Sequence, residues 1–137
     1  MAEEEIPVCG IVMPISEMGE YTAQHWTDVR NMWSDIIKQA GMEPNLVSEA
    51  DSAGDIQIRI FQNLWTNPLV LCDVSGHNPN VMLELGLRLA FDMPTVLVKD
   101  YQTPFIFDTR TIEHVEYPSD LRWPRRRDVD GYDKFET

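Results

Sequence analysis

Three polar residues, Asn80, Glu84 and Arg88, recur every four positions in an otherwise apolar stretch over residues 78–91. Residues four apart lie on one face of a helix, so the three side chains share a single row. A helix that is apolar on its other faces is buried, and this row must therefore face either water or a pocket. Spacing alone leaves two alternatives open: an exposed Glu84–Arg88 ion pair, or a carboxylate presented to a ligand.

Asn78 and Pro79 mark the start of this helix. Asn is a favoured N-cap, and Pro suits the first helical position because its missing N–H costs nothing there. The preceding loop over residues 73–77 begins with Asp73, is rich in hydrogen-bonding groups, and holds a glycine that lets a ligand approach the backbone. A helix N-terminus also attracts anions and the oxygens of a sugar or phosphate. This setting favours a ligand facing Glu84 over an exposed ion pair.

A carboxylate in such a place suits the cleavage of an N-glycosidic bond. Breaking a C1′–N bond develops oxocarbenium character on the sugar, which an ionised carboxylate can stabilise or capture as a covalent ester. Glu84 is the candidate for this role. A second polar group would bind the ribose hydroxyls or protonate the departing base, and the candidates are Asp73, Asp51 and Asp108. The choice stays open, because an Asp at a strand or loop end commonly serves as a cap or turn former.

The elements that must position these residues alternate between strand and helix patterns. Apolar runs predict strands over residues 7–14, 45–48, 68–73, 93–98 and 115–117. Helical spacing predicts helices over 22–40, with Gly41 at the C-cap, over a segment that holds Ile56, Ile60 and Leu64, and over 78–91. This order indicates an α/β fold, with helices on both faces of a mostly parallel sheet of about five strands.

In a parallel sheet of this kind, the ligand lies beyond the carboxyl ends of the strands, where the strand order reverses. Three loops qualify by this rule, those over residues 13–19, 50–54 and 73–80. Asp51 or Ser52 of the second loop can also cap the helix that follows. The three loops are therefore the expected walls of the binding site.

Composition restricts the class of partner. The chain of 137 residues suits one domain, and its net charge of −12 disfavours nucleic-acid polymers and anionic membranes, though not a small phosphorylated ligand. Cys9 and Cys72 lie in separate apolar runs and the histidines are scattered, so no metal or other cofactor is expected. No signal segment or membrane span is recognisable, which predicts a soluble, cytoplasmic protein.

The order of several short motifs resembles that of the nucleoside 2-deoxyribosyltransferase-like proteins. The specific part is residues 72–86, which read CDVSGHNPNVMLELG. Met13-Pro14, the block over residues 49–56 and the segments 94–98 and 104–110 continue the pattern, so the match covers roughly residues 7–118. These proteins are close in fold to bacterial Toll/interleukin-1 receptor (TIR)-like NAD hydrolases.

The resemblance implies a flavodoxin-like, three-layer α/β/α domain over residues 6–118, with residues 119–137 as an irregular C-terminal segment of the same domain. It further implies that Glu84 is the nucleophile or the oxocarbenium-stabilising acid, that Asp73 acts with it, and that no metal is needed. The residues expected to bind the substrate, from the resemblance and from the loops above, are Met13, Pro14, Ser16, Asp51, Ser75, Gly76, Asn78, Asn80 and Asp108.

The expected function is cleavage of the N-glycosidic bond of a nucleoside, a nucleotide or NAD, by hydrolysis or by (deoxy)ribosyl transfer. The alternative is a non-catalytic module that senses a nucleotide or serves as an interaction surface. In the transferases that the chain resembles, a neighbouring subunit can complete the pocket, so a homo-oligomer is an open alternative. The expected partners are otherwise small molecules only.

Overall fold

The structure, a computed structural model, describes residues 5–47, 56–105 and 113–123. These residues form five strands, three α-helices and one 3-10 turn, η2. In chain order they are β1 (Val8–Val12), α1 (Ala23–Gln39), β2 (Glu43–Leu46), α2 (Ile56–Thr66), β3 (Leu69–Asp73), η2 (Ser75–His77), α3 (Pro79–Ala90), β4 (Thr95–Asp100) and β5 (His114–Tyr117). In this part of the chain, no helix is long and apolar enough to span a membrane.

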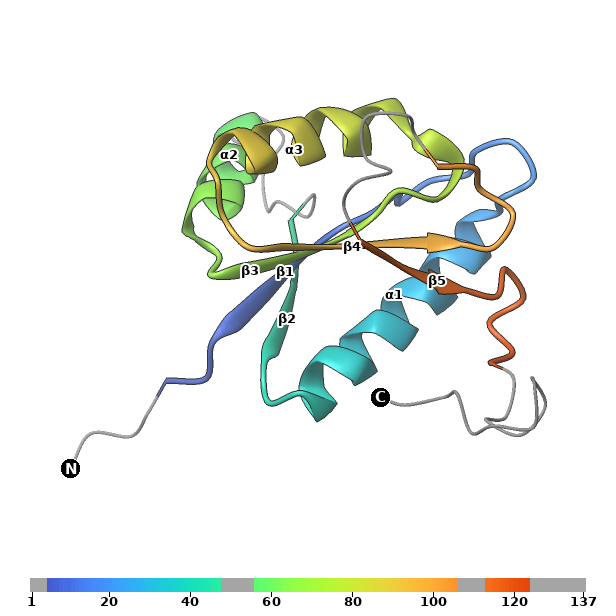
Figure 1. The fold of residues 1–137 in the computed structure, drawn as a ribbon, viewed down its shortest axis with the longest axis horizontal. Helices are drawn as coiled ribbons and strands as arrows, with labels where there is room; N and C mark the ends of the chain where they lie inside the picture. The colour runs from blue at the N-terminus through green and yellow to red at the C-terminus, as the bar shows by residue number, and fades with distance from the viewer. Residues whose placement is uncertain (1–4, 48–55, 106–112, 124–137) are drawn as a thin grey trace.

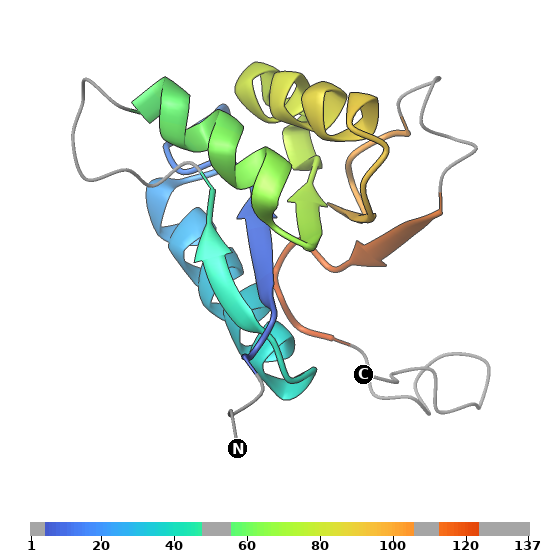
Figure 2. The same cartoon turned by 90° about the vertical axis from the view of Figure 1, so that its left-hand side faces the viewer.

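The strands form one parallel sheet in the order β2-β1-β3-β4-β5. Figures 1 and 2 show α1 on one face of this sheet and α2 and α3 on the other. The architecture is a flavodoxin-like, three-layer α/β/α fold, and the predicted fold class is confirmed. The strand order reverses at β1, which pairs with β2 on one side and β3 on the other. The carboxyl end of β1 is therefore the expected ligand edge.

Two apolar clusters hold the three layers together, one on each face of the sheet. From α1, four large residues spaced three or four apart enter the first cluster: Trp26, Val29, Trp33 and Ile37. From α2 and α3, buried residues enter the second: Leu64, Val81 and Leu85. Truncating a buried side chain of this size to Ala costs roughly 2–5 kcal/mol. The sheet is thus packed on both faces, and the loops at the carboxyl ends of its strands extend from well-packed elements.

The predicted ends of α1 and α3 agree with the structure, whereas the predicted cap of α2, Asp51 or Ser52, lies outside the described residues. Thr22 is the N-cap of α1, where its side-chain oxygen accepts a hydrogen bond from the His25 N–H. Gly41 follows the end of the helix with a φ of 85°, a backbone conformation that glycine adopts without steric cost. β2 begins two residues earlier than predicted, because its pairing with β1 already starts at Val8 and Glu43.

β4 ends two residues later than predicted, because Lys99 and Asp100 still belong to the strand. Both side chains are buried, which a sequence pattern does not indicate for charged residues. The ammonium of Lys99 lies 2.6 Å from Glu116 Oε1 on the neighbouring strand and 4.5 Å from the centre of the Phe105 ring. These contacts replace the water that the ammonium loses on burial.

Candidate functional site

A pocket of about 510 Å³ opens at the carboxyl end of β1. The loop after β1 forms one wall, and the others come from α2, from α3 and from the cap of α3. The lining residues are Met13, Pro14, Ile15, Ser16, Ile60, Phe61, Asn78, Asn80, Val81, Leu83, Glu84 and Leu87. Six of the predicted site residues are among them: Met13, Pro14, Ser16, Asn78, Asn80 and Glu84. The fold thus brings the loop after β1 next to the start of α3, although the two segments are far apart in the sequence.

Glu84 is buried, with 6% of its surface exposed, yet its side chain contributes to the lining of this pocket. An exposed Glu84–Arg88 ion pair, the first alternative from spacing, is wrong because neither side chain lies at the surface. Arg88 is fully buried and donates hydrogen bonds from Nη1 to the Leu64 carbonyl (2.7 Å) and from Nη2 to the Pro94 carbonyl (2.9 Å). The polar row of α3 is therefore divided: Asn80 and Glu84 line the pocket, whereas Arg88 connects α3 to α2 and to the segment before β4.

The start of α3 is built as the sequence predicts. The side-chain oxygen of Asn78 accepts hydrogen bonds from the Asn80 N–H (2.9 Å) and the Val81 N–H (3.2 Å). Its Nδ2 donates to the sulfur of Met18 at 3.4 Å, which connects the cap to the loop after β1. Because the cap already uses two amides of the first turn, this helix end offers fewer N–H groups to an anion than an uncapped one.

Asp73 lies on the other face of the sheet from Glu84. Its carboxylate is fully buried and accepts hydrogen bonds from Trp33 Nε1 (3.1 Å), from the Tyr117 hydroxyl and from the Ser75 N–H (3.0 Å). It is not among the residues that line the Glu84 pocket. Successive side chains of a strand point to opposite faces, and Asp73 follows Cys72, which packs toward α2 and α3. The structure thus gives Asp73 protein partners where a substrate contact was expected.

Burial raises the pKa of Asp73, while the hydrogen bonds from Ser75, Tyr117 and Trp33 act in the opposite direction. Burial also raises the pKa of the Tyr117 hydroxyl, and the neighbouring Asp73 carboxylate raises it further. Tyr117 therefore stays protonated and acts as a donor to Asp73.

Ser75 and Gly76 hold the loop before α3 and do not line the pocket. The Ser75 hydroxyl is buried, accepts a hydrogen bond from the Asp100 N–H (2.9 Å) and lies 3.1 Å from the Tyr117 hydroxyl. Gly76 has a φ of 74° and donates its N–H to Thr103 Oγ1 at 3.0 Å. A β-carbon at Gly76 would also meet the Met18 methyl group at 2.4 Å and the Tyr21 ring at 3.0 Å, so the positive φ and the lack of space both favour glycine here.

Asp100 is a site-supporting residue that the sequence analysis missed. It is fully buried and accepts hydrogen bonds from the Tyr21 hydroxyl (2.7 Å) and from the N–H and hydroxyl of Thr103. Through Thr103 it is connected to Gly76, and through Tyr21 to the loop after β1. Its position in the sequence could have indicated this role, because Asp100 is the last residue of β4, as Asp73 is the last residue of β3.

The remaining predicted residues, Asp51 and Asp108, lie outside the described residues. In the part of the chain that is described, no group of three or more His, Cys, Asp or Glu side chains could hold a metal ion. Cys9 and Cys72 are buried free thiols, and burial raises the pKa of each.

Comparison with known proteins gives a likeness at the level of fold. No protein-family description and no curated protein matches the sequence. Among solved structures, a 2-desoxiribosyltransferase from Leishmania mexicana is similar, with a TM-score of 0.55 and 14% sequence identity. The match covers 68% of this chain and 64% of that one, so this chain matches somewhat less than two thirds of the enzyme. At this identity the likeness shows a shared fold: the chain has an α/β fold similar to that of a deoxyribosyltransferase.

Proposed function

We propose that this protein cleaves the N-glycosidic bond of a nucleoside, with Glu84 as the carboxylate that acts on the anomeric carbon. The observation that carries the proposal is the position of Glu84, a buried acid in the lining of a pocket at the carboxyl edge of the sheet. The name of the structural neighbour, a 2-desoxiribosyltransferase, supports a reaction in which a sugar is transferred. The pocket volume of about 510 Å³ lies within the range typical of small-molecule sites.

In the proposed reaction the C1′–N bond breaks and its electron pair leaves with the base. The Glu84 carboxylate either attacks C1′ to form a sugar ester or stabilises the oxocarbenium ion. Water or a second base then attacks C1′ and gives the hydrolysis or the transfer product. The acid that protonates the departing base remains a prediction among Asp51, Asp108 and Asp73; Asp73 would need to act from the opposite face of the sheet.

The pocket lining divides into a polar and an apolar part. Ser16 and Asn80 provide hydroxyl and amide groups suited to sugar hydroxyls, beside Asn78, whose side-chain oxygen caps α3. The apolar part is suited to the flat faces of a base: Ile15, Ile60, Phe61, Val81, Leu83 and Leu87. Because Glu84 itself is buried, the attraction between its carboxylate and a developing cation is stronger than it would be in water.

The charge of the lining favours a neutral nucleoside over a nucleotide or NAD. Among the described residues, the pocket contains one acid, Glu84, and no Lys, Arg or His side chain. The Asn80 and Val81 amides are already occupied by the Asn78 cap. A phosphate would therefore meet the negative field of a chain with a net charge of −12 without a cation from these residues.

The test is product analysis by chromatography after the protein is mixed with ribonucleosides, 2′-deoxynucleosides, nucleotides and NAD. We expect release or exchange of the base from a nucleoside, and a loss of roughly a thousandfold or more in the Glu84→Gln variant. Glu20→Gln, which changes an exposed carboxylate, is the matched control and should retain full turnover. Undiminished turnover by Glu84→Gln would remove Glu84 from the mechanism.

The same panel separates the enzyme from a nucleotide-sensing module. A ligand that raises the thermal unfolding midpoint yet leaves no product would favour the sensor. Cleavage of NAD or nucleotides with intact nucleosides would contradict the substrate class inferred from the uncharged polar lining.

A further inference from the structure

The solvent side of α3 carries no charged side chain. The two charged residues of this helix, Glu84 and Arg88, are both buried. Its exposed residues are all uncharged: Pro79, Asn80, Leu83, Gly86, Leu89 and Ala90. A helix at the surface of a globular protein normally turns its charged side chains to the solvent. The outer side of α3 therefore has the composition of a surface that is covered, although it is exposed in the single chain.

The neighbouring helix α2 extends this surface, and Figures 1 and 2 show the two helices side by side. Phe61 and Trp65 lie four residues apart on α2, and Trp65 is 58% exposed. The ring centres of Trp65 and Phe91 lie 4.8 Å apart, and Phe61 and Leu83 both line the Glu84 pocket, so the apolar side chains of the two helices are continuous. The α2/α3 face is the name used below for this surface: Phe61, Trp65, Leu83, Gly86, Leu89 and Ala90.

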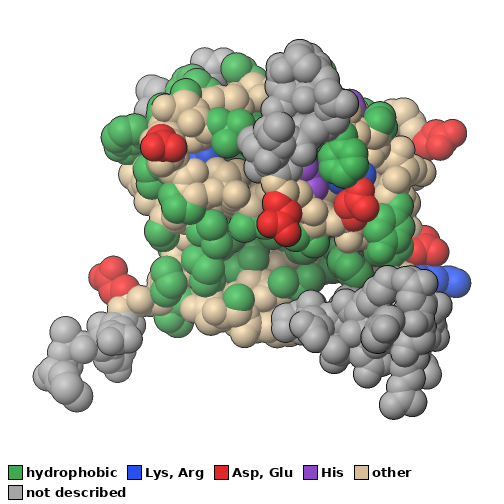
Figure 3. All heavy atoms as spheres, viewed as in Figure 1, with side chains coloured by type: hydrophobic (Ala, Val, Ile, Leu, Met, Phe, Trp, Pro, Cys, Tyr) green, Lys and Arg blue, Asp and Glu red, His purple; other side chains and the backbone are tan. Residues whose placement is uncertain are grey.

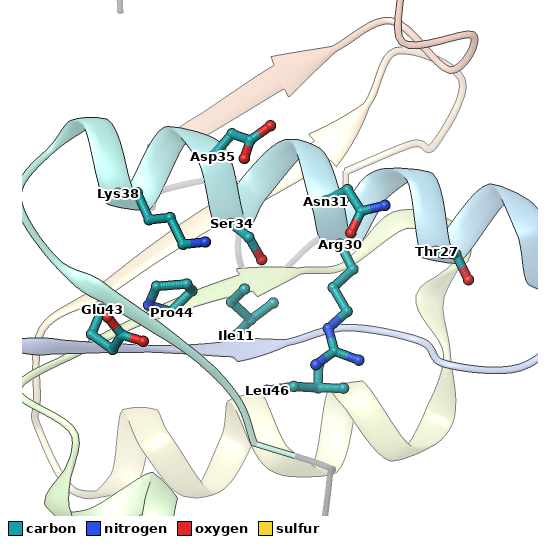
Figure 4. Close-up of a pocket in the computed structure, with 10 residues that line it drawn as sticks. All are labelled: Ile11, Thr27, Arg30, Asn31, Ser34, Asp35, Lys38, Glu43, Pro44 and Leu46. Carbon is teal, nitrogen blue, oxygen red and sulfur yellow. The ribbon is translucent and has the colours of Figure 1, made fainter.

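The distribution of acids distinguishes the α2/α3 face from other parts of the molecule. The chain has 23 Asp and Glu residues, but α2 contains none, and the one acid of α3 is the buried Glu84. The helix on the opposite face of the sheet differs, because Asp28, Asp35 and Lys38 of α1 are exposed. Figure 4 shows Asp35 and Lys38 along α1. The α2/α3 face is thus a surface without acids in a strongly acidic chain.

The charge of the molecule indicates which partner fits this face. A contiguous exposed apolar surface is stabilised by contact with another apolar surface. A charged partner would find no charged side chain to pair with among the residues of the α2/α3 face. Two copies of a chain with a net charge of −12 repel each other, and the repulsion is weakest where both surfaces lack acids. The α2/α3 face of a second copy meets both conditions.

From these observations we infer that two copies of this chain associate through the α2/α3 face in a two-fold symmetric contact. Such a contact places the same surface of each copy together, so that surface must contain both projections and hollows. Leu83, which is 64% exposed, and Trp65 project from the face. Gly86 provides a hollow, because a β-carbon at this position would have open space around it. Since Phe61 and Leu83 also line the Glu84 pocket, the second copy lies at the mouth of that pocket.

The size of the α2/α3 face sets the strength of the contact. At about 1.5 Å of rise per residue and about 10 Å of width per helix, α2 and α3 present a face of roughly 18 Å by 20 Å. This is at the small end of specific protein interfaces, where association is reversible. We therefore expect a dissociation constant in the micromolar range, so that single chains and dimers coexist. The association does not depend on the proposed glycosidic reaction, and no substrate is needed to test it.

Sedimentation equilibrium of the full chain, from about 1 µM to about 1 mM, measures the association. We expect the weight-average mass to rise with concentration from that of one chain toward that of two. Ionic strength gives a second measurement, because salt screens the repulsion between two acidic chains. The dimer should therefore tighten between about 0.01 M and about 0.15 M salt, whereas an interface held by ion pairs would weaken.

Two variants on the face test its role, and a third variant is the matched control. Trp65→Glu brings two carboxylates into the contact, one from each copy, and should weaken association about tenfold or more. Tyr101→Glu adds the same charge at a 55% exposed aromatic residue after β4, outside the face, and should change the affinity by less than about twofold. Gly86→Lys makes the chain less acidic, yet should also weaken association, because two ammonium groups then meet in the contact. The open space at Gly86 accommodates the new side chain.

Three results would each overturn the inference. They are the mass of one chain at every concentration, an association that weakens with salt, and equal dimer affinity in the Trp65→Glu and Tyr101→Glu variants. The first result would leave the α2/α3 face to a partner other than this chain. Circular dichroism of each variant shows whether it is folded, and Gly86→Lys tests the face independently if Trp65→Glu is not.

Discussion

At the scale of single residues, the structure separates two acids that look equivalent in the sequence. Glu84 lies in a pocket lining, whereas Asp73 accepts hydrogen bonds from Trp33, Tyr117 and Ser75 in the closed interior. A fully buried carboxylate without a cation among these partners is costly to ionise. The protonation state of Asp73 therefore affects the free energy of unfolding, which can be measured independently of any activity.

Asp73→Asn tests this effect. Because burial raises the folded-state pKa of Asp73, the folded protein keeps a proton that the unfolded chain loses above about pH 4. This group thus contributes stability at low pH that is lost as the pH rises from there through the folded-state pKa. Since Asn cannot ionise, we expect the variant's free energy of unfolding to fall less between about pH 4 and pH 7. Urea unfolding at a series of pH values measures it.

Asp92→Asn, at an exposed position, is the matched control and should follow the pH dependence of the unaltered chain. If the free energy of unfolding of Asp73→Asn and of Asp92→Asn changed with pH in the same way, ionisation of Asp73 would not destabilise the folded protein.

At the scale of elements, α3 is the helix on which the site depends. Its N-cap, Asn78, fixes where the helix begins and also contacts Met18 in the loop after β1. Its last turn is anchored by Arg88, which donates hydrogen bonds to the carbonyl groups of Leu64 and Pro94. Glu84 lies between these two anchors, so the orientation of its side chain toward the pocket is set by both ends of the helix.

The cap can be tested by Asn78→Ala. The variant leaves the Asn80 and Val81 amides without their side-chain acceptor, and we expect a loss of about 1 kcal/mol in the free energy of unfolding. Asn80→Ala changes an exposed residue of the same type in the same pocket and should cost less than about 0.5 kcal/mol. Chemical unfolding measures both, and an equal cost in the two variants would contradict the capping role.

At the scale of the whole molecule, the dominant feature is the net charge of −12. Figure 3 shows acidic side chains at several places on the described surface of one face. Excess charge of one sign destabilises the compact state through self-repulsion, and salt screens that repulsion. The same excess acts against phosphorylated ligands wherever no cation offsets it.

Thermal unfolding in salt therefore gives a whole-molecule prediction. Raising the ionic strength from about 0.01 M to about 0.15 M shortens the Debye length from roughly 30 Å to roughly 8 Å. We expect the unfolding midpoint to rise over this interval, as measured by circular dichroism. Sodium chloride and potassium chloride should act alike if screening is the cause, and a midpoint that falls with salt would show that attractive pairs outweigh the repulsion.

The sequence by itself determined the order of the elements, the parallel sheet and the start of α3. Helical periodicity, the apolar runs and the Asn78-Pro79 cap are local signals, and local geometry is enough to interpret them. The order of the elements also placed the loops over residues 13–19 and 73–80 at the carboxyl edge of the sheet, and residues 13–16, 78 and 80 of these loops line the pocket, whereas Asp73, Ser75 and Gly76 do not.

Only the tertiary structure decided which way the buried polar groups point. A parallel strand is covered on both faces, so the apolar run of β3 does not show that Asp73 faces α1. The four-residue spacing of Glu84 and Arg88 places them on one row, but about 6 Å of helix separates them, and each meets a different neighbour. Tyr117 and Trp33 are distant from Asp73 in the sequence. Contacts between such segments depend on sheet order and register, which no local pattern contains.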